Sequence, residues 1–371
     1  MKCFLPLAAL IMFSAMSHAA ALRFYVGTYT NKPASKGIYT GVIDSETGKL
    51  GPVTLAGEAA NPSFLALSPS GKFLYAAIEA ATSSAAAFRV QPDGSLASLN
   101  SLPAPAGACH ISTDHTGGNI FVAGYGGGSI ACFHANPDGS LDKQTAFVQF
   151  SGSGPDPRRQ TKPYAHSIYA DPADRFVYSC DLGTDHVWIF KFDATTGTLP
   201  PNDPPAAKVP PGGGPRHLAF HPGGRFVYVN NEMGQSVTTF ARDAATGALT
   251  PLQTLSSLPA GIHTTGMVTT SEIFCHPSGK WLYVSNRGHD SIATYAIAAD
   301  GMLTWLDDAP SPVKMPRGFA IDPTGRWLIA AGQDDNKITV LKIDQDTGKL
   351  SPTGEFADVG IPVCVIFAPQ K

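Results

Sequence analysis

The chain has little charge and no excess of either sign. Only 15% of its 371 residues are Asp, Glu, Lys or Arg, and the formal net charge is −3. Proteins that bind nucleic acids or anionic membrane surfaces usually concentrate basic residues. The composition therefore gives no electrostatic basis for either kind of partner. The apolar share of 43% is large enough for a packed core.

Cysteine is scarce and follows no recognisable pattern. Six cysteines are present, and Cys3 belongs to the extreme N-terminus. The other five are an odd number, widely spaced and without a CxxC pair, so they do not form a disulfide framework. We expect these five to be buried apolar side chains in strands: Cys109, Cys132, Cys180, Cys275 and Cys364.

The motifs of common metal, cofactor and nucleophile sites are also missing. There is no HxH, HExxH or facial-triad spacing. The glycine triplets 126–128 and 212–214 match neither a phosphate loop nor a dinucleotide loop. No serine lies in a nucleophile elbow, and no cysteine has an identifiable histidine partner. We expect no cofactor and no metal, although a metal held by ligands from several repeats stays open. Any chemistry should be non-covalent acid–base work.

Residues 1–20 have the features of a secretory signal peptide. Lys2 precedes a short apolar run over 4–13, and Ser17-His18-Ala19 resembles a cleavage site. The run is too short to span a membrane as a helix. We expect cleavage after this segment, a mature chain of residues 21–371 without membrane insertion, and a periplasmic or secreted location.

Helical periodicity is absent from the mature chain, and one β-hairpin unit recurs instead. In residues 214–232, GPRHLAFHPGGRFVYVNNE, two alternating apolar runs flank a Pro-Gly-Gly turn. Equivalent units have their turns at these positions: Pro69, His115, Pro172, Pro222, Pro277, Pro323 and Pro369. The spacings are 46, 57, 50, 55, 46 and 46 residues. This is the period of a four-stranded propeller blade.

The seventh unit contains only its first strand, because the chain ends after it. The missing strands are found at the other end, in RFYVGTYT, GIYTGVID and TGKL. We therefore predict an all-β, seven-bladed β-propeller with four antiparallel strands per blade. The N-terminal strands should complete the last blade and leave no open edge. Residues 21–371 should form a single domain, and we expect a monomer.

Three longer inserts, at 150–164, 200–214 and 257–270, each precede a first strand. They should lie on one face of the ring, where sites are usually built. Residues 151–163, SGSGPDPRRQTKP, form a Pro- and Arg-rich loop beside His166 that could reshape a pocket there.

The repeat also predicts which side chains meet at the channel mouth. The position six before each turn opens the first strand, and the position ten after it closes the second strand. The opening positions hold Ser63, Cys109, His166, Arg216, Ser271, Arg317 and Val363. The positions that follow them hold Phe64, His110, Ser167, His217, Glu272, Gly318 and Cys364. The closing positions hold Tyr29, Glu79, Tyr125, Leu182, Glu232, Arg287 and Gln333.

These positions bring histidine, arginine and glutamate to the ends of otherwise apolar strands. A wet channel mouth or bonding between blades would explain single polar residues. A mixed group of acids and bases from neighbouring blades favours a functional site. We take His110, His217, Glu272, Arg317 and Gln333 as candidate substrate-binding residues.

Four segments carry a resemblance to a known family: HISTDHTGG, GPRHLAFHPGGRFVYVNNE, LYVSNR and PRGFAIDPTGRWLIAAGQ. They resemble the lactonase family of seven-bladed propellers, over essentially the whole mature chain. This family contains the bacterial propeller-type 6-phosphogluconolactonase and the fungal carboxy-muconate lactonizing enzyme. The resemblance implies metal-free chemistry and four catalytic positions: His166, Arg216, Glu232 and Arg287.

The expected function is an exported lactone hydrolase of the 6-phosphogluconolactonase type, a carboxylic-ester hydrolase that opens a sugar lactone. Glu232 or His166 would take a proton from the attacking water. Arg216 and Arg287 would stabilise the oxyanion or hold a carboxylate or phosphate. Two alternatives stay open: lactonizing (cycloisomerase) chemistry, and a non-catalytic periplasmic binding or scaffold propeller. Which small lactone or organic acid is the partner also stays open.

Overall fold

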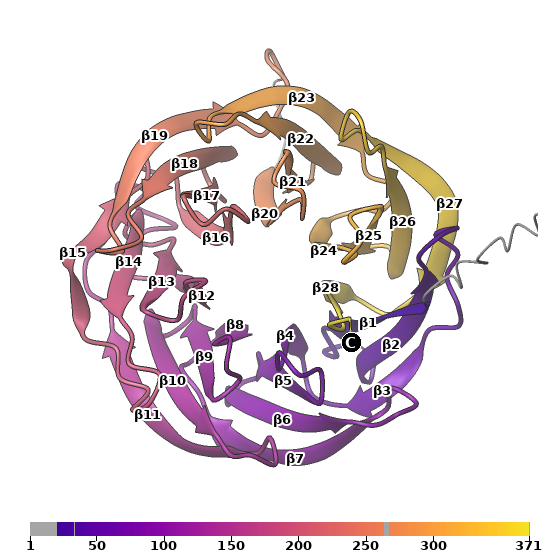
Figure 1. Cartoon of the computed structure of the whole chain (residues 1–371), viewed down its shortest axis with the longest axis horizontal. Helices are drawn as coiled ribbons and strands as arrows, with labels where there is room; N and C mark the ends of the chain where they lie inside the picture. The colour runs from indigo at the N-terminus through magenta and orange to yellow at the C-terminus, as the bar shows by residue number, and fades with distance from the viewer. Residues whose placement is uncertain (1–20, 33, 263–266, 371) are drawn as a thin grey trace, which may run out of the picture.

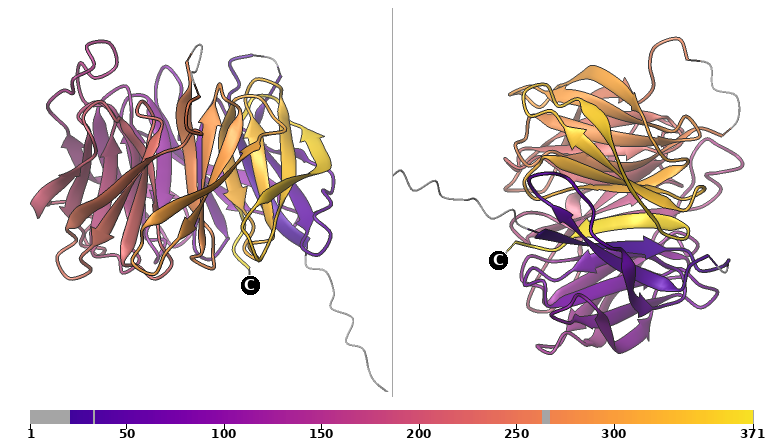
Figure 2. Two further views of the ribbon diagram at one scale, coloured as in Figure 1. Left: turned by 90° about the horizontal axis from the view of Figure 1, so that it is seen from above. Right: turned by 90° about the vertical axis from the view of Figure 1, so that its right-hand side faces the viewer.

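Seven four-stranded antiparallel sheets are arranged in a ring around a central axis, as Figure 1 shows. The structure is a computed structural model that describes residues 21–32, 34–262 and 267–370. Seen edge-on, the sheets form a ring with loops on its two faces (Figure 2). The described residues contain no helix, and so no helix long and apolar enough to cross a membrane. The expected signal peptide, residues 1–20, lies outside the described residues.

Each blade runs from an innermost strand at the channel to an outermost strand at the rim. Three blades hold β4 (Pro62–Leu67), β5 (Phe73–Ile78), β6 (Ser84–Val90), β7 (Leu96–Pro103); β8 (Ala108–Thr113), β9 (Asn119–Gly124), β10 (Ser129–Ala135), β11 (Leu141–Gln149); and β12 (Ala165–Ala170), β13 (Phe176–Asp181), β14 (His186–Lys191), β15 (Pro201–Lys208). Three more hold β16 (Pro215–Phe220), β17 (Phe226–Asn231), β18 (Ser236–Arg242), β19 (Leu249–Ser256); β20 (Thr269–Cys275), β21 (Trp281–Arg287), β22 (Ser291–Ile297), β23 (Leu303–Pro310); and β24 (Pro316–Ile321), β25 (Trp327–Gly332), β26 (Lys337–Ile343), β27 (Leu350–Asp358).

The seventh blade joins the two ends of the described chain. Its order is β28 (Pro362–Phe367), β1 (Ala21–Thr28), β2 (Gly37–Asp44) and β3 (Thr54–Glu58). The C-terminal β28 is innermost and pairs antiparallel with β1, with Phe24 opposite Phe367 and Val26 opposite Val365. The predicted seven-bladed propeller and its closure by the N-terminal strands are therefore confirmed. Closure pairs strands that would otherwise be open edges.

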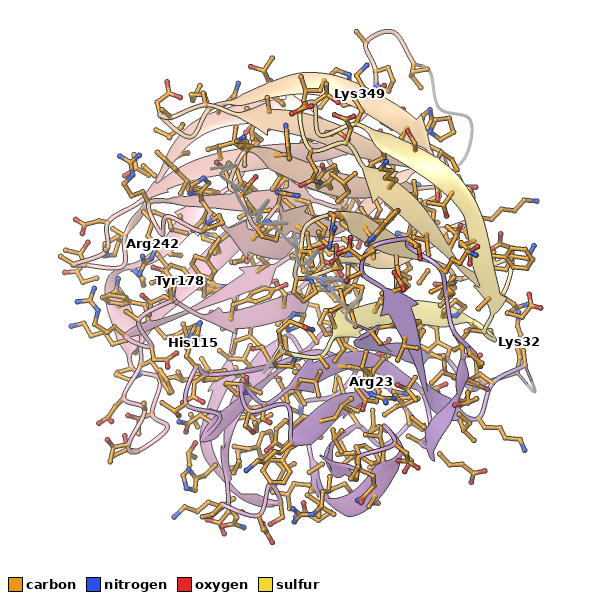
Figure 3. The ribbon with its side chains drawn as sticks, turned by 45° about the vertical axis from the view of Figure 1, so that its right-hand side comes forward. Arg23, Lys32, His115, Tyr178, Arg242 and Lys349 are labelled. Atoms are coloured by element: carbon orange, nitrogen blue, oxygen red, sulfur yellow. The ribbon has the colours of Figure 1, made fainter. Side chains whose placement is uncertain are left out.

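Buried tyrosines on the second strands link neighbouring blades. The hydroxyls of Tyr25, Tyr178, Tyr228 and Tyr283 donate to the carbonyl oxygens of Gly94, Gly247, Gly301 and Gly348, at 3.1, 2.8, 3.2 and 2.7 Å respectively. Each acceptor is a turn glycine with positive φ in the next blade. Arg242 reinforces one link by donating to the Tyr178 hydroxyl at 3.3 Å, and Figure 3 labels both residues. These bonds hold the blades in fixed relative positions, which the channel site requires.

One of the three predicted inserts contains a strand. Residues 201–208, inside the insert predicted over 200–214, form β15, the outermost strand of its blade. Three prolines fit there because an outermost strand needs hydrogen-bond donors on one side only. The loop over 151–163 is present as predicted, and residues 263–266 of the third insert lie outside the described residues. The five cysteines are free, and four are buried while Cys275 is partly buried.

Candidate functional site

Innermost strands carry a register irregularity at the position where the strand opens. The residues skipped in the pairing are Ser63, Cys109, His166, Arg216, Arg317 and Val363, and in β20 the pair Ser271 and Glu272. A β-bulge leaves its extra residue unpaired and redirects the side chain. The opening residue and the next one therefore both reach the channel, as with Arg216 and His217, whose Nη1 and Nε2 atoms are 3.2 Å apart.

The predicted meeting of strand ends in the 214–232 unit is confirmed. Pro215 pairs with Asn231 and His217 pairs with Asn230, so Arg216 lies between them beside Glu232. Asn230 Oδ1 accepts from the backbone N–H of His217 at 2.9 Å, and its Nδ2 donates to the Ser271 carbonyl at 2.8 Å. The hairpin and the next blade are thus fixed together at this edge.

The Glu232 carboxylate is the centre of the site. Arg159 Nη2 donates to Oε1 at 2.7 Å. Three groups face Oε2: Arg287 Nη2 at 3.1 Å, Arg216 Nε at 3.2 Å and His166 Nε2 at 3.7 Å. The Glu232 side chain is only 7% exposed. Burial alone would raise its pKa, but Arg287, His166, Arg216 and Arg159 together hold the pKa well below its usual range. Glu232 is therefore an anion at neutral pH.

His166 lies beside this anion as a neutral imidazole. Burial, and then the charge of Arg216, lower its pKa well below the usual value, against the opposing effect of Glu232. Its Nδ1 lies 3.9 Å from Cys109 Sγ. The expectation that no cysteine has a histidine partner is thus wrong, because β8 and β12 come from neighbouring blades and their bulges face each other. Burial raises the pKa of Cys109 to about 12, so this thiol is not an activated nucleophile.

Two cavities with shared lining residues form the site. The mouth pocket, of about 210 Å³, is lined by Glu79, Cys109, Tyr125, His166, Glu232, Arg287 and Arg317. All seven occupy the predicted opening or closing positions. The vestibule, of about 500 Å³, is lined by Tyr125, Arg159, Glu232, Met267, Thr269, Arg287, Met315, Arg317 and Gln333. The two cavities share four lining residues, so they adjoin each other at the channel mouth.

Positive charge exceeds negative charge around these cavities. Four arginines (159, 216, 287 and 317) contact or line the site against two carboxylates (Glu79 and Glu232), a surplus of two positive charges in a chain with net charge −3. Tyr29 joins two of these groups, accepting from Arg317 Nη2 at 3.0 Å and donating to Glu79 Oε2 at 2.8 Å. The site is therefore suited to an anionic group or to developing negative charge.

Arg216, His217 and Glu272 lie deeper in the channel, between the mouth pocket and the separate cavity that Glu272 lines. Arg216 and His217 line neither mouth cavity. Arg216 Nη1 donates to the Ser271 carbonyl at 2.6 Å, and His217 Nδ1 lies 2.7 Å from Glu272 Oε1. Burial raises the pKa of Glu272 to about 8, and burial together with Arg216 lowers that of His217. The His217–Glu272 pair therefore carries no net charge at neutral pH.

The nine predicted site residues therefore divide into three groups. His166, Glu232, Arg287 and Arg317 line the mouth pocket, and Gln333 lines the vestibule. Arg216 and His217 lie beneath the pocket. His110 and Glu272 line a separate cavity further along the channel. The opening and closing positions of the repeat predict which residues lie at the channel, but not how deep in the channel each one lies.

Arg159 is a site residue that the repeat positions do not predict. It lies in the loop over 151–163, outside the repeat, and therefore occupies neither an opening nor a closing position. Two contacts fix the loop: Asp156 Oδ1 accepts the backbone N–H of Arg159 at 2.9 Å, and the buried Gln160 Nε2 donates to Asp185 Oδ1 at 2.7 Å. The Pro- and Arg-rich composition was the available signal, but it does not distinguish Arg159 from Arg158.

Across residues 21–32, 34–262 and 267–370, no group of three His, Cys, Asp or Glu side chains is arranged to hold a metal ion.

Comparison with known proteins gives a consistent relationship. The family model "Lactonase, 7-bladed beta-propeller" matches residues 23–367. The 6-phosphogluconolactonase of Bacillus subtilis is 32% identical, with 93% of this chain and 98% of that protein covered. The 6-phosphogluconolactonase of Formosa agariphila is 31% identical, with 88% and 94% covered. The structure of the Pseudomonas aeruginosa periplasmic gluconolactonase has a TM-score of 0.88 at 28% identity, with 95% and 100% covered. The chain therefore belongs to the seven-bladed β-propeller lactonase family.

Proposed function

We propose that this protein is an exported lactone hydrolase of the 6-phosphogluconolactonase type, a carboxylic-ester hydrolase that opens a sugar lactone to its aldonic acid. One observation carries the proposal. A buried carboxylate, Glu232, is held by three arginines, and the neutral His166 lies beside it in a small pocket. The names of the relatives, 6-phosphogluconolactonase and periplasmic gluconolactonase, support the same reaction.

In this proposal His166 takes the proton from the attacking water. Glu232 has the supporting role, because the arginines that hold its pKa low keep it an anion. The imidazole is unprotonated at neutral pH and lines the mouth pocket. As it accepts the proton, the Glu232 carboxylate 3.7 Å away stabilises the imidazolium. The same proton then passes to the ring oxygen when the C–O bond of the lactone breaks.

Arg287 and Arg317 stabilise the oxyanion that forms on the carbonyl carbon. Both guanidinium groups line the mouth pocket and the vestibule. A fixed cation aimed at developing charge in a partly dry pocket is worth about 3–4 kcal/mol in other enzymes. Arg216 has a positioning role in this scheme, since it lies beneath the pocket and contacts Glu232 from below.

Export rests on residues 1–20, with their Lys2, apolar run and Ser17-His18-Ala19 site. The likeness to a periplasmic gluconolactonase supports the same location. We propose that this segment is removed and that the mature chain acts as a monomer in the periplasm or outside the cell. Amino-terminal sequencing of protein from the periplasmic fraction tests this, and a retained Met1 would contradict it.

The reaction is tested with purified mature protein in a pH-indicator assay corrected for spontaneous hydrolysis. The panel holds glucono-, galactono- and 6-phosphogluconolactone and muconolactone-type acids, with and without a chelator. We expect turnover of at least one sugar lactone that persists with chelator and is lost in Glu232→Gln. Turnover only of muconolactone-type acids would favour lactonizing chemistry. A folded protein without turnover on the whole panel would favour the binding or scaffold alternative.

A further inference from the structure

Glu79 is a carboxylate of the mouth pocket that takes no part in the reaction proposed above. It follows β5, at the closing position of its blade, and its side chain is partly exposed. It lines the mouth pocket together with His166 and Glu232. Its backbone N–H donates to the carbonyl oxygen of Asn61 at 3.0 Å, which fixes the base of the side chain. Glu79 is therefore a held but accessible group on the pocket wall.

The two carboxylates of the mouth pocket have different partners. Glu232 contacts three arginines, which occupy both of its oxygens. Glu79 follows β5, on the opposite side of the ring from β17 and Glu232 (Figure 1). Within residues 21–32, 34–262 and 267–370, Glu79 forms no ion pair, and its side chain accepts one hydrogen bond, from Tyr29 to Oε2. Its Oε1 atom is therefore available to a ligand.

Tyr29 joins Glu79 to a cation of the same pocket. Arg317 Nη2 donates to the Tyr29 hydroxyl at 3.0 Å. A guanidinium can only donate, so the hydroxyl uses its single proton on Glu79 Oε2, 2.8 Å away. The Tyr29 ring also lies 5.4 Å from Arg317 Cζ, close enough for a cation–π contact. The three side chains thus form a fixed unit with an acceptor at one end and a donor at the other.

The chemistry around Glu79 favours a hydroxyl group as its ligand. A cationic ligand would meet the positive charge of the four arginines around the site. An anionic group would be repelled by the Glu79 carboxylate itself. A neutral O–H group avoids both costs and makes a charge-assisted hydrogen bond to Oε1.

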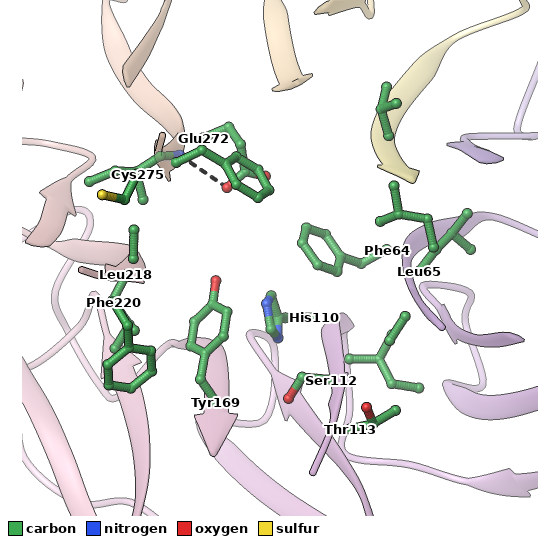
Figure 4. Close-up of a pocket in the computed structure, with 17 residues that line it drawn as sticks. Phe64, Leu65, His110, Ser112, Thr113, Tyr169, Leu218, Phe220, Glu272 and Cys275 are labelled. Atoms are coloured by element: carbon green, nitrogen blue, oxygen red, sulfur yellow. Dashed lines mark hydrogen bonds between the residues drawn. The ribbon is translucent and has the colours of Figure 1, made fainter. Parts of the chain in front are cut away.

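The cavity further along the channel is less suited to a hydroxylated ligand. Figure 4 shows its lining, with Phe64, Tyr169 and Phe220 among mainly apolar side chains. Its acidic side chain, Glu272, is only 6% exposed and is 2.7 Å from His217 Nδ1. A ring that carries several hydroxyl groups therefore finds a better acceptor in the mouth pocket.

We infer that Glu79 is a specificity-determining residue that binds the hydroxyl on the carbon next to the lactone carbonyl. The inference rests on the proposed function, in which Arg287 and Arg317 hold the carbonyl oxygen. Two consecutive hydrogen bonds, of 3.0 and 2.8 Å, connect Arg317 through Tyr29 to Glu79. A carbonyl oxygen on Arg317 therefore brings the hydroxyl of the adjacent carbon closest to Glu79. The preferred substrates are lactones with this hydroxyl.

A matched pair of substrates tests the inference: glucono-δ-lactone and its 2-deoxy analogue, which lacks only this hydroxyl. The kcat/KM of each lactone is divided by its rate of spontaneous hydrolysis, which removes the difference in intrinsic reactivity. We expect the wild type to prefer the hydroxylated lactone about tenfold to a hundredfold, as for one hydrogen bond to a charged group. Equal corrected values would overturn the inference and leave the lactonase function standing.

Variants of Glu79 assign the preference to this residue. Glu79→Met keeps the length of the side chain without the acceptor, and it should lower kcat/KM about tenfold more for glucono-δ-lactone than for the 2-deoxy analogue. Glu79→Gln retains a carbonyl oxygen and should keep part of the preference. Glu58→Met, the same change at an exposed position of β3, is the matched control and should keep all of it. An unchanged preference in a folded Glu79→Met protein would overturn the inference.

Direct binding separates this inference from the proposed function. If the wild type hydrolyses neither lactone, the proposed function fails, and ligand-observed NMR titration of the same two lactones then decides the inference. Tighter binding of the hydroxylated lactone would support the role of Glu79, and equal affinities would contradict it. The wild-type comparison also stands if Glu79→Met does not fold.

Discussion

Arg159 Nη2 lies 2.7 Å from Glu232 Oε1 and joins a loop outside the repeat to the central carboxylate of the site. Arg159 is the most exposed cation around Glu232, with 35% of its side chain accessible. It lines the vestibule, whereas Arg216 lies beneath the pocket. Arg159 can therefore contact the part of a substrate that lies in the vestibule, while the buried Arg216 and Arg287 keep their contacts with Glu232.

Arg159→Ala should change the preference among lactones. We expect its kcat/KM for a phosphorylated or carboxylated lactone to fall about tenfold more than for a neutral lactone, since one charge-assisted bond is lost. Steady-state kinetics on matched phosphorylated and unphosphorylated substrates measure this ratio. Arg158→Ala is the control, because Arg158 has the same charge, is its direct neighbour and is exposed. An equal loss for both substrates would remove Arg159 from substrate recognition.

Glu232→Gln should abolish most turnover. The amide cannot stabilise a protonated His166, and three arginines lose their counter-charge. We expect kcat to fall about a hundredfold or more, the usual effect of removing acid–base support. Glu58→Gln, the same change at an exposed position of β3, is the control. Near wild-type kcat in a folded Glu232→Gln protein would show that this carboxylate is not needed.

Arg216→Ala should cost about a hundredfold in kcat/KM, and Arg216→Lys should restore little of it. The guanidinium contacts Glu232 through Nε at 3.2 Å and the Ser271 carbonyl through Nη1 at 2.6 Å. A lysine ammonium is a single point and cannot make both contacts. Kinetics and thermal denaturation of both variants, beside exposed Arg225→Ala, separate the site effect from general destabilisation. Full activity of the lysine variant would contradict this geometry.

Glu272→Gln should become relatively more stable than the wild type as pH rises from 4.5 to 8. Burial raises the folded-state pKa of Glu272 from 4.5 to about 8. In this range the folded protein retains a proton that the unfolded chain has released, so the wild type loses stability with rising pH. Glutamine is neutral throughout and lacks this loss. Denaturant unfolding of both proteins at several pH values gives the difference, and a difference independent of pH would refute the shift.

Cys109 should be chemically inert although it lies in the mouth pocket. Burial raises the pKa of its thiol to about 12, so almost no thiolate exists at pH 8. We expect no labelling of Cys109 by iodoacetamide in the native protein at pH 8, and turnover in Cys109→Ala within a few-fold of wild type. Mass spectrometry locates the label, with labelling in denaturant as the positive control. Rapid native labelling would reopen nucleophilic catalysis by this residue.

The sequence alone determined the blade number, the closure and the residues around the channel. These follow from short-range rules: alternating apolar residues specify strands, and Pro-Gly turns specify hairpins. A hairpin necessarily brings its first and last residues together, so Arg216 and Glu232 were placed side by side without knowledge of the fold around them. The sequence likewise predicts that the five cysteines after residue 20 are unpaired and lie in strands, and the structure has them free.

Only the tertiary structure decided how deep each side chain lies and which groups from different blades touch. The β-bulge in β16 turns both Arg216 and His217 towards the channel. A bulge is a shift in the pairing of two strands, and the alternation of apolar and polar residues along one strand does not predict it. The Cys109–His166 contact and the separation of His110 from the mouth pocket depend on how neighbouring blades face each other. Arg159 reaches Glu232 from a loop whose course is set by the long-range bond of Gln160 to Asp185. Sequence periodicity describes one strand at a time, whereas depth and contact between blades are properties of the closed ring.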